Sequence, residues 1–293
     1  MRNALRRSCR LAAVSALALA GSLGGSVTAT ADAPGHSGFT VDVNLTAAGI
    51  QAPDSHPAGT VTFRISTDDP GSRQLQIFKP HPGVSIDQML ADTARAFDPA
   101  TAAEGIRALN ADGEALGGAT ATPANAAIMS EDLAEGTVYL VDLTPVQSGG
   151  APLVKPLELC KDAGYHLPHF PHGIVIQHET DQGPRFQTED VDKAEGSYYV
   201  HNSATELHEM AIQPVAPGTT DEQVQQFFDG TYTGPPLFTG TAVGLGVVSP
   251  DHSVVFHEDK LAPGTYVLLC FIPDDSTGIP HAFEGMHKVV ELK

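Results

Sequence analysis

The residues of this sequence that could carry out chemistry gather near its C-terminus. Cys270 ends an apolar run, and His281 and Met286 follow it in one loop. They offer a thiolate, an imidazole and a thioether, a mixture of ligands that suits copper in both common oxidation states. Two histidines and a cysteine in one plane, with a weak axial methionine, make a blue-copper site. A second histidine is therefore required, and it must come from another strand because one loop cannot surround an ion.

His208 is the candidate for this second histidine, in the segment NSATELHEM at residues 202–210. It follows Asn202 by six residues. With this spacing, the second half of the chain resembles the cupredoxins of the plastocyanin and azurin type, in which an asparagine ends a core strand six residues before the first ligand. The last loop of that family runs Cys…Pro-His-x-x-x-Gly-Met-x-x-x-Val, and residues 280–290 fit this pattern.

The resemblance implies a complete ligand set for one type 1 copper. His208, Cys270 and His281 would be the equatorial ligands and Met286 the axial one. It also implies that His281 lies near the solvent and passes the electrons. Ten residues separate Cys270 from His281, a longer loop than in plastocyanins, and Glu209 stands where many members have asparagine. The negative charge of a carboxylate at this position should favour the oxidised ion.

An internal duplication organises the rest of the chain. Blocks of similar sequence recur in the same order with small gaps, which makes chance similarity improbable. We therefore expect two homologous domains, 36–160 and 173–293, joined by a linker at 161–172. The matching blocks are 59–63 with 196–200, 76–83 with 211–218, 130–137 with 257–265, and 155–159 with 288–292. Each copy also holds one helix-like stretch, at 85–96 and at 220–228.

The pattern within each copy is mostly that of strands. Val61, Phe63 and Ile65 alternate with polar residues, as expected for a half-buried strand. Proline and glycine separate such runs, as they do between the strands of a sandwich. The predicted fold is all-β, with two tandem Greek-key β-sandwich, cupredoxin-like domains that each carry a short helical insert.

The first copy lacks the ligands of the second. Its aligned positions are Arg73, Asp142, Ser148 and Leu153, the last two placed only loosely because the loop is shorter. With no thiolate or imidazole among them, the first copy is expected to bind no copper and to serve as a structural or docking domain. Solvated side chains are the favoured interpretation for Arg73 and Asp142, and an ion pair between them in the vacated site is the alternative.

The two cysteines leave an alternative to the metal site. Only Cys160 and Cys270 remain in the mature chain, and an exported protein with two cysteines can form a disulfide. The repeat alignment places them near the ends of different strands, which favours the metal site.

The linker holds His166, His169 and His172, with prolines between them. In a polyproline II conformation these rings would share one face about 9 Å apart, too far for one ion to bridge. A stiff, solvated spacer is the favoured interpretation, and a metal site formed by a tight turn is the alternative.

The N-terminus has the pattern of a secretory signal peptide. Four arginines precede an apolar stretch at 11–23, and Ala-Thr-Ala at 29–31 fits a cleavage site. We expect removal of residues 1–31 and a periplasmic or secreted product. No later stretch is apolar for long enough to predict a membrane span.

The charge balance bears on the partners. The chain has 16 Lys and Arg against 35 Asp and Glu, a net charge of −19. This net negative charge excludes electrostatic binding to nucleic acid. It is compatible with a partner protein that has a basic surface.

The leading hypothesis is a blue-copper electron carrier that serves a redox partner protein. One alternative is a copper-handling or adhesive protein that transfers no electrons. The other is a two-domain copper oxidase or nitrite reductase, in which a histidine directly beside the cysteine leads to a catalytic copper. Here Leu269 and Phe271 flank Cys270, and the chain has no His-x-His pair, so the sequence favours a carrier over an enzyme.

Overall fold

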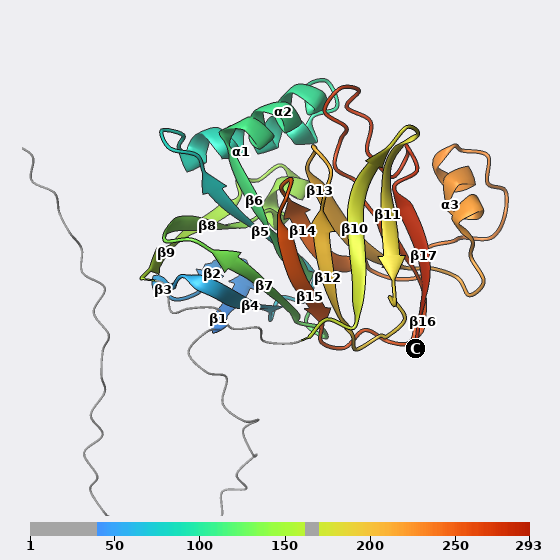
Figure 1. Cartoon of the computed structure of the whole chain (residues 1–293), viewed down its shortest axis with the longest axis horizontal. Helices are drawn as coiled ribbons and strands as arrows, with labels where there is room; N and C mark the ends of the chain where they lie inside the picture. The colour runs from blue at the N-terminus through green and yellow to red at the C-terminus, as the bar shows by residue number, and fades with distance from the viewer. Residues whose placement is uncertain (1–39, 162–169) are drawn as a thin grey trace, which may run out of the picture.

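The computed structural model describes residues 40–161 and 170–293 and confirms the predicted all-β fold. Both copies are built mainly of strands, with short helices between them (Figure 1). In the first copy the elements are β1 (Thr40–Thr46), β2 (Gly49–Gln51), β3 (Ser55–Pro57), β4 (Gly59–Thr67), β5 (Arg73–Pro80), α1 (Ile86–Phe97), α2 (Ala102–Asp112), β6 (Gly113–Ala121), β7 (Ala127–Leu133), β8 (Gly136–Asp142), the 3-10 helix η1 (Thr144–Ser148) and β9 (Leu153–Cys160). In the second they are β10 (Gly173–Thr180), β11 (Gly183–Glu189), β12 (Ser197–Asn202), β13 (His208–Pro214), α3 (Asp221–Phe228), β14 (Val243–Val248), β15 (Ser253–Glu258), β16 (Gly264–Leu269) and β17 (His287–Leu292).

Both predicted helical inserts are present, and each begins directly after a capping residue. The Ser85 hydroxyl accepts the Gln88 N–H at the start of α1, and Thr220 forms a capping box with Gln223 at the start of α3. The first insert contains a second helix, α2, that the sequence did not predict. Gly105 lets α2 approach α1 closely, since a Cβ there would clash with the backbone of Ala96.

The sheet topology of the two copies is the same. In one sheet the order β2-β1-β4-β7 of the first copy is matched by β11-β10-β12-β15 in the second. In the other sheet β6-β5-β8-β9 is matched by β14-β13-β16-β17, with β3 as an extra edge strand in the first copy. The register agrees as well, since Gln76 pairs with Val141 where Ala211 pairs with Leu269. This agreement supports the predicted duplication.

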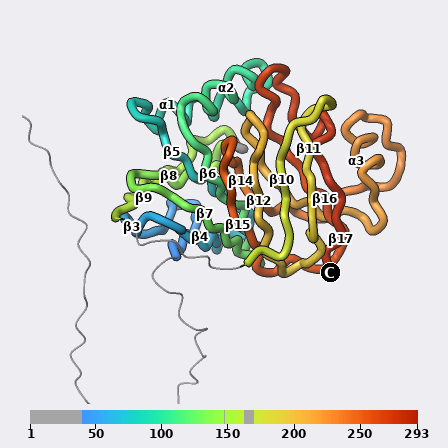
Figure 2. The backbone as a smooth tube through the Cα atoms, in the orientation of Figure 1, coloured from blue at the N-terminus to red at the C-terminus, as the bar shows by residue number. Residues whose placement is uncertain are grey.

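The sequence did not predict that strands also pair between the copies. β7 pairs antiparallel with β15, and β6 with β14, so each sheet runs on from one copy into the other (Figures 1 and 2). In the first of these pairs Met129 lies opposite its own counterpart Phe256, and in the second Ala119 lies opposite Leu245. A pseudo-twofold axis therefore passes through both sheets, as in an isologous dimer interface.

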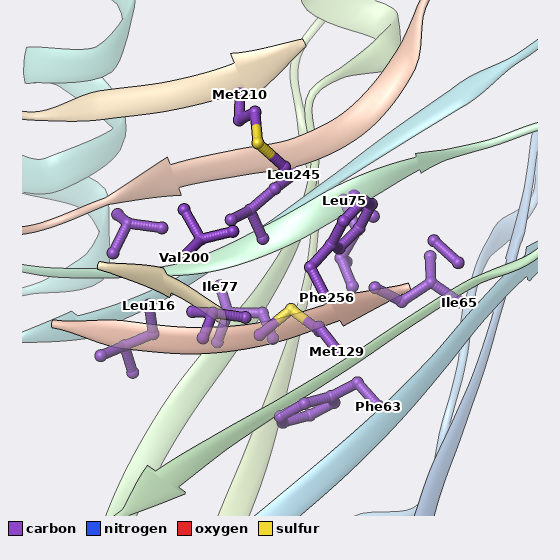
Figure 3. Close-up of a cluster of buried hydrophobic side chains, with 14 of the residues drawn as sticks. Phe63, Ile65, Leu75, Ile77, Leu116, Met129, Val200, Met210, Leu245 and Phe256 are labelled. Atoms are coloured by element: carbon purple, nitrogen blue, oxygen red, sulfur yellow. The ribbon is translucent and has the colours of Figure 1, made fainter. Parts of the chain in front are cut away.

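The hydrophobic core is likewise continuous between the copies. Figure 3 shows Phe63 and Met129 of the first copy near Phe256 of the second, and all three are buried. The same cluster of buried residues includes Cys270 and Met286. The C-terminal candidate residues are thus set in the main core rather than on its periphery.

Some expectations fall on residues outside the described ranges, namely the signal peptide at 1–31 and His166 and His169 of the linker. His172 is exposed, and its Nδ1 accepts the N–H of Ser197 at 3.2 Å. Among the described residues, no helix has both the length and the apolar character needed to cross a membrane.

Candidate metal centre

The loop that leads to His208 is held by Asn202, the last residue of β12. The buried Asn202 amide donates to the carbonyls of Glu206, at 2.8 Å, and Val248, at 2.9 Å, while its oxygen accepts the Ala204 N–H at 3.0 Å. These three bonds tie the 203–207 turn to the neighbouring strand. His208 therefore enters β13 from a fixed position.

An irregularity in β13 sets the direction of His208. The pairing register with β14 shifts between His208 and Met210, as in a β-bulge, which can re-aim a side chain. Glu209 occupies this bulge. Its N–H points to the Cys270 Sγ at 3.4 Å, and its Oε1 accepts the Phe271 N–H at 3.0 Å. The bulge thus contacts Cys270 and Phe271, the two residues that directly follow β16.

The loop between β16 and β17 supplies the other two residues. The Met286 N–H donates to the His281 carbonyl at 2.9 Å, the Met286 carbonyl accepts the Cys270 N–H at 3.4 Å, and the Ala282 N–H donates to the Cys270 carbonyl at 2.7 Å. The side chains of Cys270, His281 and Met286 are all buried. The backbone therefore holds Met286 beside both of the other candidate ligands.

Three donor atoms converge at this point. The His208 Nδ1 lies 3.0 Å from the His281 Nδ1 and 3.8 Å from the Cys270 Sγ, and the His281 Nδ1 lies 3.5 Å from the same sulfur. An ion bound at about 2.0 Å by nitrogen and about 2.3 Å by sulfur separates its in-plane ligand atoms by about 3.5–3.8 Å. The two sulfur–nitrogen distances match this spacing, while the two nitrogens lie about 0.5 Å closer to each other than it requires. In type, the two imidazoles with a thiolate are the donors expected for copper.

Carboxylates lie behind both imidazoles. The His281 Nε2 is 3.2 Å from a Glu206 oxygen, and the His208 Nε2 is 3.5 Å from a Glu179 oxygen. For a neutral His281, the bond to Glu206 favours the tautomer with its proton on Nε2, which leaves Nδ1 to bind a metal ion. The buried His208 Nε2 lies near Glu179 but makes no hydrogen bond among the described residues. Glu179 and Glu206 were not among the predicted site residues. Only the position of Glu206, two residues before His208, could have drawn attention to it.

The protonation states of the cluster favour a thiolate. Burial alone would raise the pKa of Cys270, but hydrogen bonds with His208 and His281 bring it down to about 6. Burial likewise opposes a charged His281, yet its contacts with Cys270 and Glu206 raise its pKa to about 10. The pKa of Glu206 is lowered, chiefly by its hydrogen bond to His281. The thiolate is the form of cysteine that binds metals.

One expectation about His281 is wrong. The resemblance implied a ligand near the solvent, but His281 is 0% exposed. The ten residues between Cys270 and His281 fold into a small hairpin, closed by a bridge between Pro273 and Pro280. The Arg107 guanidinium of α2 donates to the Asp275 carbonyl at the tip of this hairpin. The extra length of the loop therefore forms a hairpin directly before the buried His281, and the insert of the first copy contacts this hairpin.

The equivalent place in the first copy holds an ion pair, so the favoured expectation of solvated side chains is wrong and the alternative is the one observed. The Arg73 Nε and Nη2 donate to one Asp142 oxygen at 2.8 and 2.7 Å, and its Nη1 donates to Asp69 at 2.6 Å. Arg73 and Asp142 are both buried. Ser148 is exposed and Leu153 half-buried. The four aligned positions contain no metal-binding cluster.

The disulfide alternative is not borne out. Cys270 is a free, buried cysteine, so it forms no bond with Cys160. Cys160 ends β9, at the position that the repeat alignment predicted. The sulfur of Cys270 therefore remains available to a metal ion.

The second copy has the features on which the resemblance rests. Asn202 ends a strand, His208 begins the next, and Cys270 follows β16 directly before the His–Met loop. The fold is cupredoxin-like.

No family model matches the chain, and no curated protein matches it. Among solved structures, auracyanin from Roseiflexus castenholzii, reduced with sodium dithionite, is 20% identical; the match covers 41% of this chain and 94% of that one, with a TM-score of 0.25. Auracyanin A, a "blue" copper protein from Chloroflexus aurantiacus, is 15% identical over 41% of this chain and 98% of that one, with a TM-score of 0.29. A Cu-containing nitrite reductase from Thermus scotoductus SA-01 is 11% identical over 87% of this chain and 61% of its own, with a TM-score of 0.24. At these TM-scores the assignment of the site depends on the side-chain geometry described above.

Proposed function

We propose that this protein binds one type 1 copper ion in its second copy and carries single electrons between partners. His208, Cys270 and His281 would be the equatorial ligands and Met286 the axial one. The observation that carries the proposal is the convergence of two imidazole nitrogens and one cysteine sulfur in a fully buried cluster. A copper ion held there would supply a one-electron couple with a thiolate ligand.

The protein's own residues would keep the ligands in place. Glu206 orients the His281 imidazole through a hydrogen bond, Glu179 lies 3.5 Å from the His208 Nε2, and the Glu209 N–H reaches the Cys270 sulfur. Since the ligands are fixed by backbone bonds and by burial, little rearrangement should accompany a change of charge. That property suits electron transfer, which requires no substrate pocket.

Export and the type of partner are part of the same proposal. The signal-peptide pattern at the N-terminus supports export from the cytoplasm, and the net charge of −19 favours a partner with a basic surface. Because His281 is buried, electrons would reach the site through the groups around it. Phe271 and Phe283, which both lie in the loop between β16 and β17, are 43% and 45% exposed and are candidates for the docking surface.

The enzyme alternative finds no support in the residues beside the site. Leu269 and Phe271 flank Cys270, so the histidine bridge of the tandem-domain oxidases and reductases is missing. Copper storage without electron transfer differs from a carrier only in redox behaviour, so it must be tested by measuring that behaviour.

The test of the proposal is a comparison of the metal-loaded wild type with Cys270→Ser. The wild type should show an intense visible band from thiolate-to-copper charge transfer and a reversible one-electron couple. Cys270→Ser should lose the band and most of its copper affinity, since a hydroxyl is a poor ligand for copper. Copper binding with a band but without reversible reduction would favour storage, and a band that persists in Cys270→Ser would disprove the ligand set.

A further inference from the structure

A large cavity lies beside the candidate metal centre, between the helices of the first copy and the ligand loop of the second. Its volume is about 640 Å³, within the range of about 300–1,000 Å³ typical of pockets for small organic molecules. Thr93 of α1 and Ile106 of α2 line one side, and Val243 of β14 and Ile272 of the ligand loop line another. Both copies are therefore needed to form it.

The walls are mainly apolar. Aromatic rings come from Phe78, Phe97 and Phe271, and aliphatic side chains such as Leu109 and Leu143 fill the spaces between them. Two of these rings are also open to water, since Phe97 is 55% and Phe271 43% exposed. Exposed aromatic side chains at an apolar cavity are a common sign of a binding site.

The few polar groups of the cavity indicate the charge of its ligand. Glu209 is the one ionisable side chain in the described lining, and its Oε1 already accepts the Phe271 N–H. Arginine, lysine and histidine do not line the cavity, and the chain as a whole is strongly acidic, so an anion would find no partner there. The hydroxyls of Ser72, Thr120 and Thr241 remain for neutral hydrogen bonds.

We propose that this cavity binds an uncharged organic molecule with an aromatic or otherwise apolar body. Its affinity comes from the burial of apolar surface between the rings of the two copies, and the hydroxyls at its margin orient the ligand. Contacts between the copies support the wall, since the Arg107 side chain donates to the Asp275 carbonyl and the Asn110 amide donates to the Thr205 carbonyl at 3.3 Å.

The cavity adjoins the candidate metal centre without being part of it. Three lining residues, Glu209, Phe271 and Pro280, are the sequence neighbours of His208, Cys270 and His281. The proposal does not depend on copper, because neither the ligand nor the cavity requires the ion. It is therefore tested on the metal-free full-length mature chain, where its failure is separate from a failure of the copper proposal.

The probe is N-phenyl-1-naphthylamine, an uncharged aromatic dye that fluoresces strongly in apolar surroundings. Titration should give saturable binding of one dye per chain. Its anionic analogue 8-anilino-1-naphthalenesulfonate has nearly the same rings and should bind at least tenfold more weakly. Equal or tighter binding of the anionic dye, or no saturable binding of the neutral one, would overturn the proposal.

A variant that fills the cavity locates the dye. Ala242→Phe places a ring in the cavity and should weaken binding at least tenfold, while Ala48→Phe adds the same ring at an exposed turn outside it and should leave binding unchanged. Thermal unfolding verifies that both variants fold. If Ala242→Phe does not fold, Phe97→Ala removes a ring from the rim and should weaken binding severalfold. Dye binding unaffected by the folded cavity variant would overturn the assignment.

Discussion

The two copies present the same strand framework with different chemistry at one position. In the first copy Arg73 and Asp142 form a buried ion pair at the places that His208 and Cys270 occupy in the second. The flanking strands keep the same register in both. The framework therefore does not depend on the metal centre, and a pair of complementary charges is compatible with the same fold.

The copies differ again next to these residues. In the second copy the register of β13 shifts at Glu209, beside the candidate ligand, whereas in the first the shift in β5 falls between Gln76 and Phe78. The ligand loop of the second copy also folds into a hairpin directly before the buried His281. The two copies thus differ at the candidate metal centre in the position of a bulge and in the form of a loop as well as in side chains.

Removal of Asp142 should have the largest effect on stability. Asp142→Ala leaves the buried Arg73 with Asp69 alone, and loss of one partner from a buried pair costs about 3–5 kcal/mol. Because Asp69 remains, we expect a decrease of about 3 kcal/mol in the free energy of unfolding, measured by urea denaturation. Copper content should not change.

A double variant separates the ion pair from the space it fills. Arg73→Met with Asp142→Leu replaces both charges with apolar side chains and should be much closer to wild type, since such replacements are often nearly neutral. A loss below about 1 kcal/mol in Asp142→Ala would show that the pair is not important for the first copy.

A second contrast lies at the boundary between the copies. Glu131 and Glu258 are equivalent in the duplication and both are buried. Glu131 pairs with the His252 Nδ1 at 2.7 Å, whereas Glu258 accepts the Asn125 amide at 2.6 Å. Burial raises the pKa of Glu131 to about 7, against the lowering effect of His252, and the pKa of His252 is also raised. Lys79 and Glu114 act on the same pair.

These shifts predict that stability decreases as the pH rises. Between about pH 4.5 and pH 7, Glu131 is more fully protonated in the folded protein than in the unfolded chain. The stability that protonated Glu131 contributes is therefore fully present below pH 4.5 and is lost as the pH rises to about 7. From pH 5 to pH 8 the wild type should lose on the order of 2 kcal/mol more than Glu131→Gln. Urea denaturation at both pH values tests this. The same loss in both proteins would exclude Glu131 as its source.

Met286 offers the smallest of the predicted effects. The axial thioether of such sites is a weak ligand, so Met286→Leu should keep copper bound and preserve the visible band. An apolar replacement excludes water and disfavours the doubly charged ion, so the reduction potential should rise, by on the order of 60 mV for a tenfold change in preference. Voltammetry measures this shift. A folded Met286→Leu protein without copper affinity would make Met286 a primary ligand.

The sequence predicted the parts that depend on local pattern. The strands followed from periodicity, and the two helical inserts at 85–96 and 220–228 recurred at equivalent places in the repeat alignment. The alignment also identified Arg73 and Asp142 as the residues in the vacated site, but the sequence favoured solvated side chains there rather than the buried ion pair. The proximity of His208, Cys270 and His281 was expected from family spacing, and their role as ligands stays a prediction.

The features that the sequence did not predict depend on contacts between distant segments. β6 pairs with β14 and β7 pairs with β15 along the edges of these strands. The alternation of polar and apolar residues in a strand does not indicate which other strand pairs with its edge. The hairpin directly before the buried His281 contacts Arg107, which is far away in the sequence. Helix α2 was missed because Gly105 lowers helix propensity and is retained for close packing against α1.

The most direct test of the central claim is the copper-to-protein ratio of the mature chain after metal-free protein is loaded with excess copper and desalted. Elemental analysis of the wild type should give one tightly held copper per chain, together with the visible thiolate band. Asp142→Ala, altered in the first copy, should give the same ratio, and Cys270→Ser should give close to none. Two tightly held coppers per chain, or none in the wild type, would contradict the account of one metal centre in the second copy.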